Sequence, residues 1–327
     1  MVIKVANMIL TVLAGIGAAL VLFWVINKLT ELLPGKWEQR VKPYVFIAPA
    51  FLSISLFLLY PAVQTIVYSF ANSASTAWVG LDNYTNLLTA NGFQQTLINT
   101  VLWIVIAPAV TIIFGLAVAV LADRLSPRGE KLSKTIIFLP MAISAVGAAT
   151  VWRFVYEYAP PGQPQVGLQN AIISAFGADP IPWLEQRTLR LNTLLLIVMF
   201  LWAQIGFSMV LLSAAIKAVP TETIEAGRID GATERQIFRR VVLPQIRNTI
   251  ITVFVTVTIG VMKLFDIVYV MTNGNYNTNV IAVEFFNQLL TNFNTGAAAA
   301  VVVMLMLAVV PIMIYQVRHF KAEEAAR

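Results

Sequence analysis

Cysteine is absent from this sequence of 327 residues, and histidine occurs once, at position 319. Without cysteine, the chain forms no disulfides and offers no thiolate for catalysis or metal binding. One histidine in a polar tail excludes a metal site built from several imidazoles. The sequence therefore predicts no metal site, and it disfavours enzymes that depend on cysteine or histidine chemistry.

Charge is also scarce, since charged residues make up 12% of the chain and hydrophobic residues 58%. Soluble domains carry about 25% charged residues. The apolar runs are continuous over about 20 or more residues, without the alternation of a barrel strand. Because lipid cannot satisfy backbone polar groups, such runs form helices. We expect an all-α integral membrane protein.

Seven apolar segments are long enough to cross a membrane. The first could be mistaken for a signal peptide, but it is too long and no small-residue cleavage site follows it. We interpret it as a retained helix. The predicted spans are Ala6–Ile26, Val45–Phe70, Leu97–Leu121, Thr135–Tyr156, Leu191–Ile216, Asn248–Val270 and Ala297–Val317.

Basic residues are concentrated in alternate connectors. Of the 22 Lys and Arg residues, 17 fall in residues 27–43, 123–134, 217–247 and 318–327. Excess Lys and Arg mark cytoplasmic loops. We therefore expect the N-terminus outside and the C-terminus inside. The net charge of +6 is explained by this orientation, so nucleic acid is not an expected partner.

A polar, charged interruption lies at Val219–Pro244, which we call the 219–244 loop. Pro220 and Glu222 are typical of a helix start, because proline is tolerated in the first turn and an acid favours the positive helix end. Gly231 interrupts the pattern, which resumes from Ala232. The sequence predicts two short helices joined at this glycine.

This loop resembles the cytoplasmic loop of ATP-binding-cassette importer permeases. That family carries Glu-Ala-Ala, a glycine after three residues, and aliphatic-x-Leu-Pro after nine more. The matching residues, with every spacing kept, are Glu225, Ala226, Gly227, Gly231, Val241, Leu243 and Pro244. Asp230-Gly231-Ala232 resembles the carbohydrate-permease variant. Gly227 departs from the usual alanine, which is expected to loosen the first helix by up to ~1 kcal/mol.

The resemblance implies a permease of six-span type with a helix-turn-helix that couples it to an ATPase. It divides the chain into 1–43, 44–96, a core module at 97–317 and a tail at 318–327. The expected coupling residues are Glu225, Ala226, Gly227, Asp230, Gly231, Ala232, Leu243 and Pro244.

The resemblance also implies partners. These are two ATPase subunits, a second and similar permease, and an external sugar-binding protein, in a bacterial or archaeal cytoplasmic membrane. ATP and Mg would bind the ATPase subunits, with no cofactor on this chain. Gly35-Lys36-Trp37 agrees with this, because it lacks the upstream glycine and following Ser/Thr of a phosphate-binding loop.

The imported sugar is indicated by a second resemblance. Thr272-Asn273-Gly274-Asn275 and the Tyr and Asn that follow resemble permeases for α-glucosides. We expect an α-linked disaccharide, such as an α-glucoside, maltose or trehalose.

Four residues are candidates for the substrate path. Lys263 and Asp266 are three apart on the sixth predicted span, hence on one helix face. Ionisable residues in a membrane are functional candidates, although this pair could instead neutralise itself near the outer interface. Gln204 and Asn99 could line the path or form interhelical hydrogen bonds. Aromatic residues that could stack on sugars or mark the interface are Trp152, Trp183 and Trp202.

Two other classes of function stay open. A secondary transporter or channel would need intramembrane acids or an inverted repeat, and the sequence offers one Lys-Asp pair and no obvious repeat. A membrane-embedded enzyme would need paired acids or a nucleophile with its base, and neither is evident.

Overall fold

The computed structural model describes residues 2–325, and the side chain of His319 lies outside the described residues. The chain forms two compact units, residues 1–67 and residues 68–327. In the part of the chain that the structure describes, there are helices and one isolated β-bridge between Ala71 and Trp78, and no strand.

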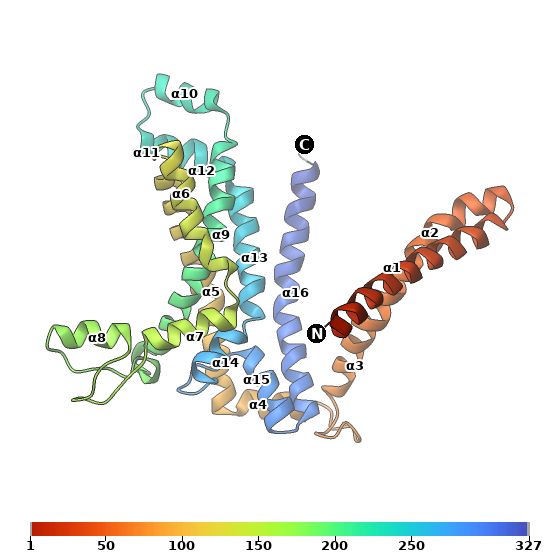
Figure 1. The fold of residues 1–327 in the computed structure, drawn as a ribbon, viewed down its shortest axis with the longest axis horizontal. Coiled ribbons are helices and arrows are strands. Elements are labelled where there is room, and N and C mark those ends of the chain that lie inside the picture. The colour runs from red at the N-terminus through yellow and green to blue at the C-terminus, as the bar shows by residue number, and fades with distance from the viewer. Residues whose placement is uncertain (1, 326–327) are drawn as a thin grey trace. The chain divides into compact units, whose positions relative to one another are not determined.

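Figure 1 shows the helices with their labels. The α-helices are α1 (Val2–Glu31), α2 (Gly35–Ile54), α3 (Tyr60–Tyr68), α4 (Asp82–Thr89), α5 (Asn91–Ala122), α6 (Pro127–Phe138), α7 (Ala145–Val155), α8 (Leu168–Ala175), α9 (Leu191–Lys217), α10 (Thr221–Ile229), α11 (Glu234–Ile237), α12 (Leu243–Gln245), α13 (Arg247–Met262), α14 (Asp266–Thr272), α15 (Ile281–Phe286) and α16 (Thr295–Ala325). π-Helical segments are Ser55–Leu59, Phe238–Val242 and Asn287–Thr291, and 3₁₀ segments are Leu139–Ala142, Trp183–Glu185 and Thr188–Arg190.

In the first unit, α1 and α2 pack against each other, and the rings of Phe23 and Phe46 stack at 5.9 Å. We expected a basic connector over residues 27–43, but only residues 32–34 separate the two helices. Pairs such as Lys28–Glu31 support helix in this polar segment. Nearly all large apolar side chains of the pair are exposed, as lipid contact requires.

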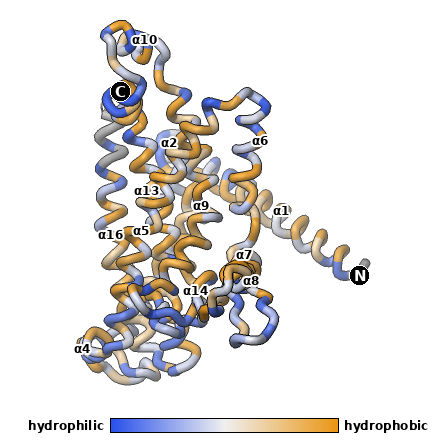
Figure 2. The backbone as a smooth tube through the Cα atoms, turned by 90° about the vertical axis from the view of Figure 1, so that its left-hand side faces the viewer, coloured by the Kyte–Doolittle hydropathy of each residue, from blue (hydrophilic) through white to orange (hydrophobic). Residues whose placement is uncertain are grey.

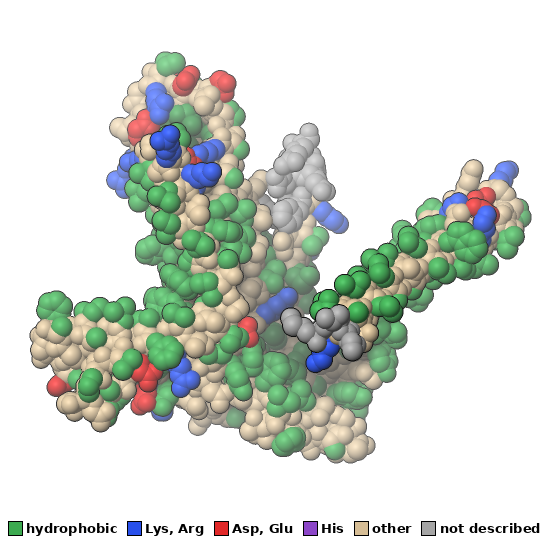
Figure 3. Space-filling view, viewed as in Figure 1, with side chains coloured by type: hydrophobic (Ala, Val, Ile, Leu, Met, Phe, Trp, Pro, Cys, Tyr) green, Lys and Arg blue, Asp and Glu red, His purple; other side chains and the backbone are tan. Residues whose placement is uncertain are grey.

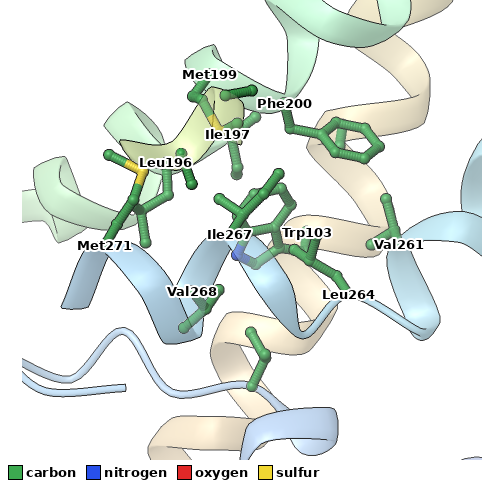
Figure 4. Close-up of a cluster of buried hydrophobic side chains, with 14 of the residues drawn as sticks. Trp103, Leu196, Ile197, Met199, Phe200, Val261, Leu264, Ile267, Val268 and Met271 are labelled. Atoms are coloured by element: carbon green, nitrogen blue, oxygen red, sulfur yellow. The ribbon is translucent and has the colours of Figure 1, made fainter. Parts of the chain in front are cut away.

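In the second unit, α5 and α9 form the centre. Trp103 of α5 is the largest fully buried side chain, and its ring meets Phe200 of α9 edge-on at 5.7 Å. Figure 4 shows that Leu264, Ile267 and Val268 lie around the same indole. One aromatic residue therefore connects α5, α9 and the start of α14.

Two glycines allow the helices to approach closely. A Cβ on Gly115 would lie 2.4 Å from Oγ of Ser208, at the contact between α5 and α9. A Cβ on Gly206 would lie 2.4 Å from the carbonyl oxygen of Ile137, where α9 passes the end of α6. Small residues at such crossings are typical of membrane bundles.

The fourth predicted span is bent and is not one continuous helix. α6 and α7 meet at 100°, and the break contains Pro140. Ser144 then caps α7, because its side chain accepts a hydrogen bond from the backbone N–H of Gly147 at 3.2 Å. The missing donor of proline and the N-cap serine end one helix and begin another.

The sixth predicted span is also broken. α13 ends before Lys263, and α14 begins at Asp266 after non-helical Phe265. Buried Leu264 lies within the break and joins the core around Trp103, while α14 packs on α7. Packing against other helices therefore breaks this apolar segment into two helices, although the sequence predicted a continuous one.

Five helices in the described residues are long and apolar enough to cross a membrane, and the number rises to seven if each of two bent pairs is one span. In the second unit, connectors 123–126 and 218–246 share one end of the bundle, which we call the loop end. Connectors 69–90, 156–190 and 273–294 meet at the opposite end, and Figure 2 shows hydrophilic residues at both ends. This separation agrees with the alternation expected from charge.

Candidate functional site

The 219–244 loop projects at the loop end as two helical segments joined by a turn (Figure 1). Gly231 lies in that turn with φ +77°, which is a left-handed conformation favourable only for glycine. Thr233 then caps α11, and its hydroxyl and the side chain of Gln236 form a capping box. The expected two helices with a glycine joint are present. Pro220, however, precedes α10 as its N-cap residue and is not in its first turn.

The coupling residues expected from the resemblance occupy different positions in this loop. Glu225, Ala226, Asp230 and Gly231 are exposed on or beside α10, whereas Ala232 and Leu243 are half-buried and Pro244 is exposed. Gly227 faces the second segment, where an added Cβ would lie 3.3 Å from Cγ1 of Ile237. Glycine at this position thus lets α10 lie close to α11.

The loop carries two features that the sequence pattern did not identify. Ile229 is 86% exposed at the end of α10, so an apolar side chain stands on the projecting surface. Arg228 Nε donates a hydrogen bond of 2.8 Å to Glu234 across the turn. The apolar character of Ile229 was visible in the sequence, but its position outside the core was not.

A small hydrophobic cluster joins the loop to the bundle. Val219, Ile237, Val242 and Ile246 are buried together, and side chains of α9 and α13 pack against them. The segment Phe238–Val242 is π-helical. It precedes Pro244, whose backbone nitrogen has no hydrogen to donate to a carbonyl of the preceding turn. This cluster packs the loop against both helices.

An ion-pair cluster lies beside the base of the loop. Lys134 Nζ lies 2.6 Å from both Asp123 Oδ1 and Glu130 Oε1, and it also hydrogen-bonds Ser213. Lys217 pairs with Glu130. These side chains belong to α6, α9 and the residue after α5, so the cluster ties three elements together. The sequence indicated only solvated basic residues here, because most of the contacts, such as Lys134 with Ser213 and Lys217 with Glu130, join residues remote along the chain.

At the opposite end, residues 272–279 form a compact connector, which we call the asparagine connector. Asn273, Gly274, Tyr276 and Asn277 all have positive φ. Such conformations cost about 1–3 kcal/mol at non-glycine residues and persist where surrounding contacts hold them. The connector is therefore held in place by its neighbours.

Asn99 supplies much of that support. Its Nδ2 donates to the carbonyl oxygens of Asn277 and, at 3.0 Å, of Asn279. Its Oδ1 accepts from Arg190. Asn192 adds a hydrogen bond of 2.8 Å to the carbonyl of Tyr276. Asn99 is fully buried in these contacts, which join α5 to connectors at this end and not to another long helix.

The other proposed path residues are not gathered with Asn99. Lys263 and Asp266 belong to the end of α13 and the start of α14, both are exposed, and no ion pair joins them among the described residues. The prediction that they share one helix face is wrong, because the helix breaks between them. Gln204 is half-buried in the middle of α9.

A polar cavity of about 210 Å³ lies at the opposite end. Its lining includes Arg153, Glu157, Trp183, Glu185 and Tyr276. The hydroxyl of Tyr276 donates a hydrogen bond of 3.0 Å to Glu185, which raises the pKa of that hydroxyl above its usual value. Arg153 and Glu157 do not share a helix, since α7 ends at Val155.

The aromatic candidates fall into two groups. Trp152 of α7 and Trp202 of α9 meet edge-on, with ring centroids 5.8 Å apart. Trp183 lies at the cavity, and its Nε1 donates a hydrogen bond of 3.0 Å to Asn170. Of the three, Trp183 alone is among the residues that line this cavity.

Comparison with known proteins gives consistent results. Residues 115–321 match the family described as binding-protein-dependent transport system inner membrane component. The alpha-glucoside transport system permease protein AglF of Rhizobium meliloti (strain 1021) is 41% identical over 332 residues, covering 96% of this chain and 97% of that protein. The osmoprotective compounds uptake permease protein GgtC of Synechocystis sp. (strain ATCC 27184 / PCC 6803 / Kazusa) is 43% identical over 283 residues, covering 86% of this chain and 100% of that protein.

A solved structure shows the same fold. A chain in the crystal structure of a bacterial ABC transporter that imports the acidic polysaccharide alginate superposes with a TM-score of 0.74. The match covers 87% of this chain and 98% of that chain, at 21% sequence identity. The predicted all-α permease fold is confirmed.

Proposed function

The chain belongs to the family of binding-protein-dependent transport system inner membrane components, and we propose that it moves an α-linked sugar across the membrane when a separate ATPase acts on its 219–244 loop. It is a permease of a binding-protein-dependent ABC sugar importer and not the subunit that hydrolyses ATP. What it contributes is a path and a mechanical link to the ATPase.

The observation that carries the coupling role is the attachment of the loop. Its outer surface, with Glu225, Ile229 and Asp230, is exposed, while its inner surface is buried against α9 and α13 through Val219 and Ile237. A partner that grips the outer surface therefore displaces two membrane helices together. Such rigid-body transfer exchanges inward-open and outward-open states.

The charged and apolar side chains exposed on the loop indicate which kind of ATPase surface would bind it. Glu225 requires a basic residue opposite it, and Ile229 requires an apolar recess. We expect two ATPase subunits that bind ATP and Mg, a second permease that completes the path, and an external sugar-binding protein. In this arrangement, the loop end faces the cytoplasm.

For the substrate, an α-glucoside is supported by AglF, to which this chain is similar over almost its whole length. Uptake of osmoprotective compounds is the second candidate, because the permease GgtC is of comparable identity. Uptake of labelled α-glucosides, maltose and trehalose is measured with and without unlabelled osmoprotective solutes as competitors. This comparison distinguishes the two candidate substrates. Saturable uptake of an α-linked disaccharide that osmoprotective solutes do not inhibit supports the first candidate, and the reverse pattern supports the second.

The coupling role is tested by crosslinking, which the absence of cysteine makes clean. A cysteine at Ile229 should crosslink to an ATPase subunit, whereas a cysteine at exposed Gln163, at the opposite end, should not. Labelling of both sites by a membrane-impermeant maleimide from outside would refute the cytoplasmic position of the loop.

A further inference from the structure

Helix α8 buries a polar side chain and exposes an apolar side. Asn170 is completely buried, whereas Leu168, Ile172 and Phe176 are 58%, 50% and 88% exposed. Ala171 and Ala175 are exposed as well. Positions 168, 171, 172, 175 and 176 have the spacing of one helix face. In a helix bathed by water on its free side, that face would point into the protein.

The inverted orientation is held by specific contacts. Asn170 Nδ2 donates hydrogen bonds to the carbonyl oxygens of Glu157 and Ile181, at 2.9 and 3.0 Å. Its Oδ1 accepts from the indole of Trp183 and from the backbone N–H of Ile181. A Cβ on Gly167 would lie 2.1 Å from the carbonyl oxygen of Glu157, so glycine is required for this approach. These contacts prevent α8 from turning its apolar face inward.

The helix lies across the axis of the bundle. In Figure 1, α8 and α7 run across the direction of α5, α9 and α13, on one side of the bundle near its opposite end. Figure 3 shows hydrophobic atoms along the side of this lobe that faces the loop end, and acidic and basic side chains on the other side. The apolar side therefore faces the level at which the long apolar helices run.

The distribution of charged residues in this lobe fits a helix that lies at a lipid interface. Residues 158–178 contain no Asp, Glu, Lys or Arg. α7 also exposes apolar side chains, Val151 and Phe154. α7 is half of a bent pair that is apolar enough to span a membrane. Because Val151 and Phe154 are apolar like the exposed face of α8, both fit the same occupant.

We propose that α8 lies in the interface of the leaflet at the opposite end of the bundle, with Leu168, Ile172 and Phe176 in lipid. An amphipathic helix in the interfacial plane buries its apolar face at the boundary between headgroups and acyl chains. The lobe then forms a shelf, with lipid against its apolar side and its charged residues directed to the aqueous phase. This role does not depend on which sugar is imported.

Single-cysteine labelling tests the proposal, because the chain has no cysteine of its own. Variants Leu168→Cys, Ile172→Cys and Phe176→Cys are labelled with an environment-sensitive fluorophore. Gln163→Cys is the control, since Gln163 is exposed in the same lobe but lies outside α8. The complex purified through the full chain is reconstituted into liposomes, with nitroxide-labelled lipid as the membrane quencher and iodide as the aqueous quencher.

We expect nitroxide lipid to quench the three α8 labels severalfold more than the Gln163 label, and iodide to show the reverse order. The pattern should hold with and without an added binding protein. Equal iodide quenching at all four sites would refute the proposal. Protection of the α8 labels from both quenchers would refute it as well, because it would show that protein covers the helix. The three positions are exposed, so loss of folding in one variant leaves two others to read.

Discussion

The ammonium of Lys134 lies 2.6 Å from Oδ1 of Asp123, and this ion pair joins α6 to the end of α5. Lys134 also contacts Glu130 and Ser213, so one side chain connects three elements beside the base of the 219–244 loop. Its side chain is 18% exposed, and that of Asp123 is 16% exposed. Water therefore weakens this cluster less than an ordinary surface pair.

Replacing Lys134 by alanine should destabilise the loop end. The substitution removes the ammonium that both Asp123 and Glu130 contact, so among the described residues these carboxylates keep only Ser213 and the more exposed Lys217 as partners. Thermal unfolding of the purified complex measures the effect. Lys131→Ala is the matched control, because Lys131 is exposed on the same helix. Equal stability of the two variants would show that the cluster is not stabilising.

Gly231→Pro should separate ATP hydrolysis from transport. Proline holds φ near −65°, whereas this residue has φ +77° and its N–H bonds the carbonyl of Arg228. Uptake should fall at least tenfold relative to ATP hydrolysis. Gly177→Pro is the control, since Gly177 has φ +81° and its N–H bonds Ser174. If both variants lose uptake equally, the effect reflects general destabilisation.

Charge reversal at Glu225 should weaken binding of the ATPase. Glu225 is exposed on α10, so Glu225→Arg should leave folding intact and lower uptake at least tenfold by repelling the basic partner residue that we propose. The measurement is the amount of ATPase that co-purifies in mild detergent. Glu222→Arg changes charge equally, one turn away on the same helix. Undiminished ATPase binding by Glu225→Arg would remove the proposed pairing.

Asn99→Ala should loosen the asparagine connector. The carbonyl oxygens of Asn277 and Asn279 would lose the buried donor Asn99, and a hydrogen bond of this kind contributes about 0.5–1.5 kcal/mol. Hydrogen exchange of residues 273–279 should increase. Asn86→Ala replaces an exposed asparagine at the same end and should change nothing. Unchanged exchange in Asn99→Ala would show that other contacts suffice.

Gly206→Ala should displace α9 from α6. The new methyl group would lie 2.4 Å from the carbonyl oxygen of Ile137, so backbone must shift, and overpacking of this kind costs about 1–3 kcal/mol. Gly260→Ala is the matched control. A Cβ there would meet no atom within 4 Å among the described residues, and alanine favours the helix by up to ~1 kcal/mol. Opposite shifts in unfolding temperature are expected.

Several features of the fold were predictable from local chemistry. The helices containing Trp103 and Gln204 appear where long apolar runs predicted them, because a bilayer leaves the backbone no alternative. Gly231 marks the joint of the 219–244 loop because the turn has positive φ. The division of the chain was less predictable, since the structure separates its two compact units after Val67, whereas the partition by function expected from the resemblance stays a prediction.

In the candidate site, too, features that depend on residues near one another in sequence were predictable, whereas contacts between distant residues were not. The projecting surface around Glu225 was predicted from spacing, and the role of that residue stays a prediction. The ion pair of Lys134 with Asp123 was not predictable, because only helix packing brings residues 11 apart in sequence together across two helices. The prediction that Lys263 and Asp266 share one helix face was wrong for a related reason. Apolar composition cannot reveal a break that core packing imposes.

By itself, the sequence determined that the chain is a helical membrane protein with a polar loop of permease type, because hydropathy, charge asymmetry and motif spacing are local properties. Tertiary structure alone decided where spans bend, which charges pair, and that Asn170 is buried while Phe176 is exposed. Those outcomes depend on contacts between residues distant along the chain, and periodicity carries no information about which distant partner a side chain meets.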